Sequence, residues 1–109
     1  MVVDELWAAL GEPNRRALLG VLRAGARGVG ELADEVGLSQ PATSKHLRVL
    51  RDAGLVTVRV EAQRRIYAVD PGGMAEFDRW LQPYRRLWND RLDALGNYLD
   101  TAEADEDQE

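Results

Sequence analysis

The sequence predicts a mostly α-helical fold with one small β-hairpin, and two patterns support this expectation. Apolar residues recur at steps of three and four over most of the 109 residues, as they do on the buried face of a helix. Between residues 55 and 69 the pattern changes to alternation with prominent β-branched residues, as in a pair of half-buried strands. The expected order is four helices, two strands and a long last helix.

Three short helices are expected in the first third of the chain. Residues 3–10 form an amphipathic pattern, which the sequence GEP interrupts. A second helix should cover residues 13–24, because Pro13 fits the first turn, where its missing N–H costs nothing. A third should cover residues 29–36, and Gly37 suits the left-handed position just past a helix end.

A fourth helix is expected over residues 40–53, and its start is clearly marked. Ser39 is a favourable N-cap, and Pro41 fits the first turn. The residues that should point into the core recur at helical spacing, and they are Thr43, Leu47 and Leu50.

The alternating stretch predicts a hairpin with a basic tip. Strands are expected over residues 55–60 and 64–69, with a turn at residues 62–63 and two arginines directly after it. The sequence DPGG at residues 70–73 is expected to close the hairpin.

The last predicted element is one long helix over residues 74–99. Pro83 lies inside it and should kink or split it. From residue 102 onwards there is no apolar periodicity and acidic residues dominate. We therefore expect one domain over residues 1–101 and a disordered acidic tail over residues 102–109.

Charge is distributed unevenly along the chain. The net charge is −5, and the segment EADEDQE alone carries five carboxylates. Residues 39–65, in contrast, contain six basic residues and two acidic ones. A local basic surface indicates an anionic partner even where the whole chain is acidic.

Several functions are excluded by residue type. There is no cysteine and only one histidine, His46, so disulfides, thiolate metal sites and a multi-histidine site within one chain are ruled out. No nucleophile is paired with a base, and no glycine-rich phosphate loop is present. We expect no enzyme activity, no cofactor and no metal.

The sequence also indicates a protein that does not enter a membrane. No apolar run is long enough to span a bilayer. The N-terminus, MVVDELWAAL, has acidic residues where a signal peptide needs basic ones. The expected location is the cytoplasm.

Two short helices joined by a tight glycine turn and followed by a basic hairpin form the pattern of a helix-turn-helix with a wing. In such a unit the N-terminal residues of the second helix enter the DNA major groove. Short polar residues there can contact bases, while arginines further along and in the wing suit phosphates. The expected DNA contacts are Gln40, Pro41, Ser44, Lys45, Arg48, Arg51, Gln63, Arg64 and Arg65.

The segment LSQPATSKHLRVLRDAGLV, followed by VEAQRRIYAVD, resembles the ArsR-type (ArsR/SmtB) winged-helix repressors of bacteria. The resemblance covers about residues 5–100. It implies a winged helix with a helix at each end and a homodimer that binds near-palindromic operators. It also implies base contacts by Gln40, Pro41, Ser44 and Lys45, with the wing on the DNA backbone.

The chain differs from the metal-sensing members of that family. Many of them bind metals through cysteines on the helix before the turn, which here reads ELADEV, or through histidines on the last helix, which here has none. The resemblance therefore implies the branch without a known metal site and with an extended C-terminal helix. That branch includes autorepressors encoded beside an unrelated partner gene.

The terminal helices carry more aromatic and aliphatic surface than one small domain can bury. Such a surface indicates contact with a second copy of the chain. The residues expected at this homodimer interface are Leu6, Trp7, Leu10, Trp80, Tyr84, Trp88, Leu92, Leu95 and Leu99.

These patterns together predict a homodimeric, sequence-specific repressor of transcription that binds a double-stranded DNA operator and regulates its own gene without a metal. Two alternatives stay open. One is a regulator of the same fold that responds to an unidentified small-molecule effector held between the terminal helices. The other is a winged helix used as a protein–protein interaction module.

Overall fold

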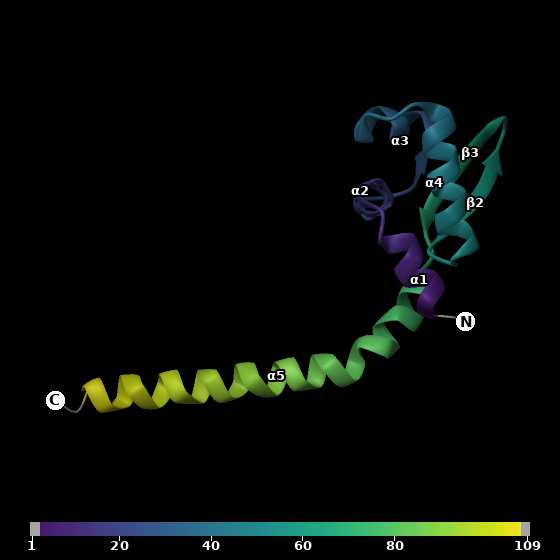
Figure 1. Cartoon of the computed structure of the whole chain (residues 1–109). Helices are drawn as coiled ribbons and strands as arrows, with labels where there is room; N and C mark the ends of the chain where they lie inside the picture. Colours follow the sequence, from purple (N-terminus) through teal and green to yellow (C-terminus); the bar gives the residue numbers. More distant parts are fainter. Residues whose placement is uncertain (1–2, 108–109) are drawn as a thin grey trace. The chain divides into compact units, whose positions relative to one another are not determined.

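The computed structural model describes residues 3–107 (Figure 1). The chain divides into two compact units, one ending at Phe77 and the other beginning at Asp78. The elements in chain order are α1 (Val3–Leu10), α2 (Pro13–Leu22), β1 (Arg27–Gly28), α3 (Val29–Val36), α4 (Gln40–Asp52), β2 (Val56–Glu61), β3 (Arg64–Val69) and α5 (Pro71–Asp107).

The first four helices confirm the boundaries expected from their caps to within two residues. The Glu12 carboxylate accepts a hydrogen bond from the backbone N–H of Arg15 at 3.0 Å and so caps α2. Gly37 adopts the left-handed conformation, with φ of 71°, at the end of α3. The Ser39 hydroxyl accepts from the backbone N–H of Ala42 at 3.2 Å at the start of α4. The polar caps thus separate α3 from α4 by a tight turn.

The buried face of α4 consists of Thr43, Leu47 and Leu50, and each of these side chains is 0% exposed. Burial of the threonine hydroxyl is compensated, because it donates a hydrogen bond to the Ser39 carbonyl at 2.8 Å. This confirms the predicted apolar face and fixes the rotation of α4 about its own axis.

One core holds the first unit together. Leu6 is 0% exposed inside it, so its side chain is already covered by its own chain. Trp7, on the next position of α1, packs edge-on against Phe77, with 5.1 Å between ring centroids. The core consists of Leu6, Ala9, Leu18, Leu19, Leu22, Leu32, Leu47, Leu50, Ala53, Leu55, Val56 and Tyr67.

The hairpin is an antiparallel pair beside α4, with β2 and β3 in register from Val56 opposite Val69 to Glu61 opposite Arg64 (Figure 1). A third strand, β1, adds to the other edge of β3. The sequence did not predict β1, because two residues are too short to show an alternating pattern. The strand ties the loop between α2 and α3 to the hairpin.

The last helix begins earlier than expected, at Pro71. The Asp70 carboxylate accepts a hydrogen bond from the backbone N–H of Gly72 at 2.9 Å. The segment DPGG therefore starts α5 instead of closing the hairpin: Pro71 takes the first helical position, which tolerates a missing N–H.

The helix α5 passes through Pro83 without being split and continues to Asp107. The helix therefore includes residues 102–107, which were expected to belong to a disordered tail. Alanine and glutamate in that segment are good helix formers. Residues 108–109 lie outside the described residues, and the domain boundary at residue 101 stays a prediction.

Gly73 lies where α5 meets the end of α4, and it is buried. A Cβ atom at this position would lie 1.8 Å from the Gly54 carbonyl oxygen, whereas one at Gly20 in α2 would meet nothing within 4 Å. Gly73→Ala should therefore lower the free energy of unfolding by more than about 2 kcal/mol. Gly20→Ala, the control, should raise it by about 0.5–1 kcal/mol. Urea unfolding followed by circular dichroism measures both, and equal effects would contradict this packing.

Candidate nucleic-acid interface

The face of α4 opposite its buried residues is open to solvent. Gln40, Pro41 and Lys45 are exposed near the start of the helix, and Ser44 is half-buried. Arg48 and Arg51 are exposed on the following turns. The positions of α4 expected to contact DNA are therefore all at least partly open to solvent.

Arginines of α4 and of the hairpin meet at a small concave site, which we call the arginine cleft. It has a volume of about 100 Å³ and is lined by Ser44, Arg48 and Arg51 of α4 and by Arg65 and Tyr67 of β3. Tyr67 is 6% exposed and belongs to the core, so one wall of the cleft is held in place by core packing. Residues of α4 and of β3 thus place three arginines at one hollow.

The charges of the arginine cleft are poorly compensated. In the part of the chain whose side chains are described, Arg48 and Arg65 form no ion pair. Arg51 has only Asp52 nearby, at 3.9 Å, and both side chains are largely exposed. Guanidinium groups donate planar, paired hydrogen bonds that match the oxygens of a phosphate. The cleft is therefore suited to binding an oxyanion.

The other wing arginine is engaged within the chain. Arg64 donates to the Glu31 carboxylate of α3 at 2.8 Å, so the two form an exposed ion pair. The pair bridges β3 and the first helix of the helix-turn-helix. Glu31 was not singled out in the sequence, because no spacing rule places α3 beside the hairpin tip. The wider hollow around this pair, about 500 Å³, is lined by Gly28, Val29, Gly30, Glu31, Gln63, Arg64 and Arg65.

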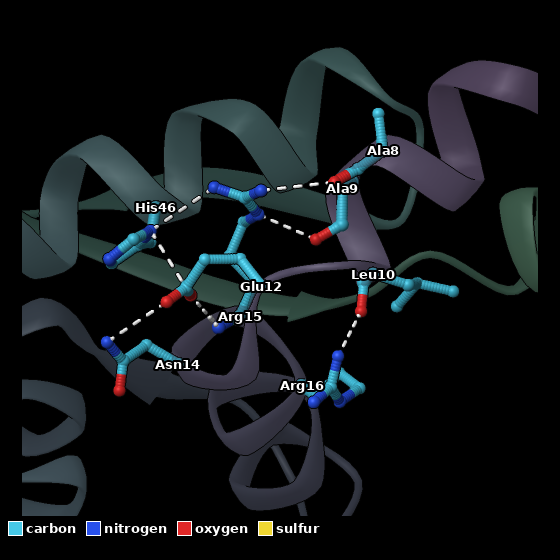
Figure 2. A network of polar contacts seen from close by, with 8 residues as sticks. All are labelled: Ala8, Ala9, Leu10, Glu12, Asn14, Arg15, Arg16 and His46. Atoms are coloured by element: carbon cyan, nitrogen blue, oxygen red, sulfur yellow. Dashed lines mark hydrogen bonds and ion pairs between the residues drawn. The ribbon is translucent and has the colours of Figure 1, made fainter.

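His46 turns away from the open face of α4. Its ring lies beside Glu12 and Arg15 at the start of α2 (Figure 2). These neighbours are 31 or more positions away in sequence, so no local pattern predicted them.

The second unit presents an apolar stripe on α5. Trp80 and Tyr84 contact each other, with 5.0 Å between ring centroids, and Trp88 is 63% exposed. The interface residues expected from the sequence did not include two members of this stripe, Leu87 and Tyr98. The large apolar residues exposed on α5 are Trp80, Tyr84, Leu87, Trp88, Leu92, Leu95, Tyr98 and Leu99.

The described residues contain neither a candidate metal site nor a membrane-spanning helix. No group of three or more histidine, aspartate or glutamate side chains there is arranged to hold a metal ion. No described helix is both long and apolar enough to cross a membrane.

A helix-turn-helix, a basic hairpin beside it and an open polar face on the second helix define a winged helix-turn-helix domain. Comparison with known proteins supports this assignment to the winged helix-turn-helix class. The helix-turn-helix domain family matches residues 10–59. The HTH-type transcriptional regulator Rv2034 of Mycobacterium tuberculosis is 39% identical over 98 residues, which cover 90% of this chain and 89% of that protein.

Solved structures show the same architecture. The crystal structure of an ArsR family transcriptional regulator matches with a TM-score of 0.69 and 30% identity, over 80% of this chain and 90% of that one. The homodimeric winged helix-turn-helix DNA-binding domain of Mb0332 from Mycobacterium bovis, solved by NMR, matches with a TM-score of 0.65 and 27% identity, over 77% and 78%. This chain belongs to the ArsR family of winged helix-turn-helix transcriptional regulators.

Because Glu31 neutralises Arg64, removing this carboxylate should strengthen DNA binding. Glu31→Gln frees one guanidinium for phosphate, and the slope of log affinity against log salt should steepen by about one. Asp34→Asn, the control, removes the same charge from α3 without touching Arg64 and should change the slope by less. Fluorescence anisotropy on a labelled duplex gives both slopes. Identical slopes would show that Arg64 already reaches phosphate with Glu31 present.

Proposed function

We propose that this protein is a homodimeric transcriptional repressor that binds a near-palindromic double-stranded DNA operator, regulates its own gene and needs no metal. The observation that carries the proposal is the arginine cleft beside the open face of α4. A phosphate-binding site next to a solvent-exposed recognition helix fits a duplex, in which the backbone borders the major groove.

The start of α4 supplies the groups that would read bases. Gln40 can form a bidentate pair with adenine, Lys45 can reach guanine, and Ser44 can contact bases or phosphates. Pro41 offers an apolar contact to a thymine methyl group. All four lie on the side of α4 that the core leaves free.

Phosphate contacts would come from the arginine cleft. Arg48 and Arg51 approach from α4 and Arg65 from β3, so one backbone segment could be held from two sides. Gln63 and Arg64 at the hairpin tip would contact the neighbouring backbone or the minor groove once Arg64 leaves Glu31.

A homodimer is supported by the apolar stripe of α5, which one chain leaves exposed. The similar NMR structure from Mycobacterium bovis is itself described as homodimeric. Two copies would place two recognition helices about one helical turn of DNA apart, and this requires a near-palindromic operator. On α1, Trp7 and Leu10 would also contact the second copy, whereas Leu6 belongs to the core.

Repression would follow from occupancy, because a dimer on a promoter blocks access of polymerase. The metal-free assignment is supported by the residue types: the chain has no cysteine and only one histidine, so it lacks the sulfur donors and the several nitrogen donors of a transition-metal sensor. The site of action would be the cytoplasm.

The proposal is tested by anisotropy of the purified protein against the DNA upstream of its own gene and against a scrambled duplex, at two salt concentrations and with a chelator. Selective binding that scales as a dimer and survives chelation is the expected result. Equal weak binding to both duplexes would contradict autoregulation. No binding at low salt would overturn the DNA assignment in favour of a protein-interaction module.

Substitutions of base-contacting and phosphate-contacting residues should have different effects on the affinity for operator and for scrambled DNA. Gln40→Ala should weaken operator binding by about 1–3 kcal/mol and leave scrambled DNA nearly unaffected. Arg48→Ala or Arg65→Ala should weaken binding to both duplexes and lower the salt slope by about one each. Arg86→Ala, which removes an arginine from α5, is the control and should change neither. A loss confined to the operator for Arg65→Ala would argue against its phosphate role.

Substitutions on the apolar stripe of α5 test whether this stripe forms the dimer interface. Trp88→Glu together with Leu92→Glu should convert the dimer to a monomer, because charges would be buried against a partner. Asn89→Glu, the control, adds one glutamate on the polar side of α5 and should leave the dimer intact. Sedimentation equilibrium measures the mass of each variant. A dimer that survives the double substitution would place the interface elsewhere.

A further inference from the structure

Arg15 connects two helices that carry different parts of the proposed function. Its Nε donates to the Ala9 carbonyl at 2.6 Å and its Nη2 to the Ala8 carbonyl at 3.1 Å, so it binds the C-terminal end of α1 (Figure 2). Its Nη1 lies 3.4 Å from Nδ1 of His46 on the recognition helix α4. One side chain of α2 thus reaches both α1 and α4.

Glu12 faces the same imidazole from the other direction. Its Oε2 lies 3.8 Å from Nδ1 of His46. The carboxylate also accepts from the backbone N–H of Arg15 at 3.0 Å and from the Asn14 amide at 3.3 Å, so it is held in place by the cap of α2. Nδ1 of His46 therefore sits between a guanidinium and a carboxylate.

Among the described side chains, Arg15 and Glu12 are the only charged groups in contact with the His46 ring. The residues three and four positions away on α4 are Ala42, Thr43, Val49 and Leu50, none of which titrates in the neutral range. The adjacent Lys45 is exposed on the open face. The side chain of His46 is 21% exposed, so protons can reach it while its contacts stay partly shielded.

The two charge states of the ring select different partners. Neutral imidazole can accept a hydrogen bond from Arg15 through Nδ1 when the proton is on Nε2. Protonated imidazole has N–H groups at both nitrogens, so Nδ1 then repels the guanidinium and can donate only to Glu12. Histidine is the side chain that changes charge between about pH 5 and 8.

We propose that Arg15 and His46 form a positioning link between α1 and the recognition helix, and that protonation of His46 releases this link and weakens operator binding as the pH falls. The inference rests on the proposed function, in which α1 adjoins the dimer interface and α4 reads DNA. With a neutral ring the link is closed, and Arg15 joins α4 to α1. When the ring is protonated, Nδ1 turns to Glu12, and α4 loses its contact with α1 through Arg15 while its buried face stays in the core.

Operator affinity measured at about pH 8 and about pH 5.5 tests the inference. Wild type should lose at least about fivefold in affinity at the lower pH, the lower end of typical coupling between sites. His46→Gln can still accept from Arg15 but does not titrate, so it should keep the high-pH affinity at both values. Arg15→Gln should show the weakened affinity at both.

Arg16→Gln is the matched control. Arg16 is the neighbouring arginine of α2 and donates to the Leu10 carbonyl at 2.7 Å, but it makes no contact with His46 in the described structure. This variant should keep the wild-type pH dependence. An acid loss that persists in His46→Gln would overturn the link. Acid-strengthened binding that disappears in His46→Gln would also overturn it, because the ring would then be a direct phosphate contact.

A measurement without DNA separates the link from the proposed function. His46 is the only histidine, so its ring signals in an NMR pH titration are unambiguous. In wild type the backbone amides at the end of α1 should change with the same midpoint as the ring, and in Arg15→Gln they should not. Amides of α1 that ignore the ring would overturn the link. Coupled signals with no DNA binding by any variant would confirm the link and overturn the repressor assignment.

Discussion

The burial of Thr43, Leu47 and Leu50 on α4 is the constraint on which the rest of the molecule depends. These side chains are 0% exposed, and the one polar atom among them is paired with the Ser39 carbonyl. A helix locked along this face can present only the opposite face to solvent. The position of every group proposed to read DNA therefore follows from the packing of groups that never touch it.

Positive charge is unevenly compensated along the chain. The whole protein is acidic, yet three arginines meet at one cleft where the described structure supplies little counter-charge. Elsewhere carboxylates engage basic side chains: Glu31 binds Arg64 across two elements, and Glu12 lies beside His46. Whether a basic side chain is free to bind a phosphate therefore depends on its local ion pairs and not on the net charge of the protein.

Local signals predicted the helices well, because caps such as Ser39 and Gly37 act within a few residues. Prediction failed where the outcome depends on tertiary contact. The strand β1 exists only because β3 is beside it, and Leu6 is in the core because other helices cover it. The arginines of the cleft were predicted individually, but their meeting with Tyr67 and the pairing of Glu31 with Arg64 required the fold.

The most direct test of the central claim is an NMR titration of the ¹⁵N-labelled protein with a short DNA duplex at low salt. The account predicts that amide signals of the first two turns of α4 and of the hairpin tip shift or broaden first. Signals of the buried core of α2 and α3 should change little. Changes concentrated on α5, or none at all, would contradict the claim that the packing of α4 creates the DNA-binding face.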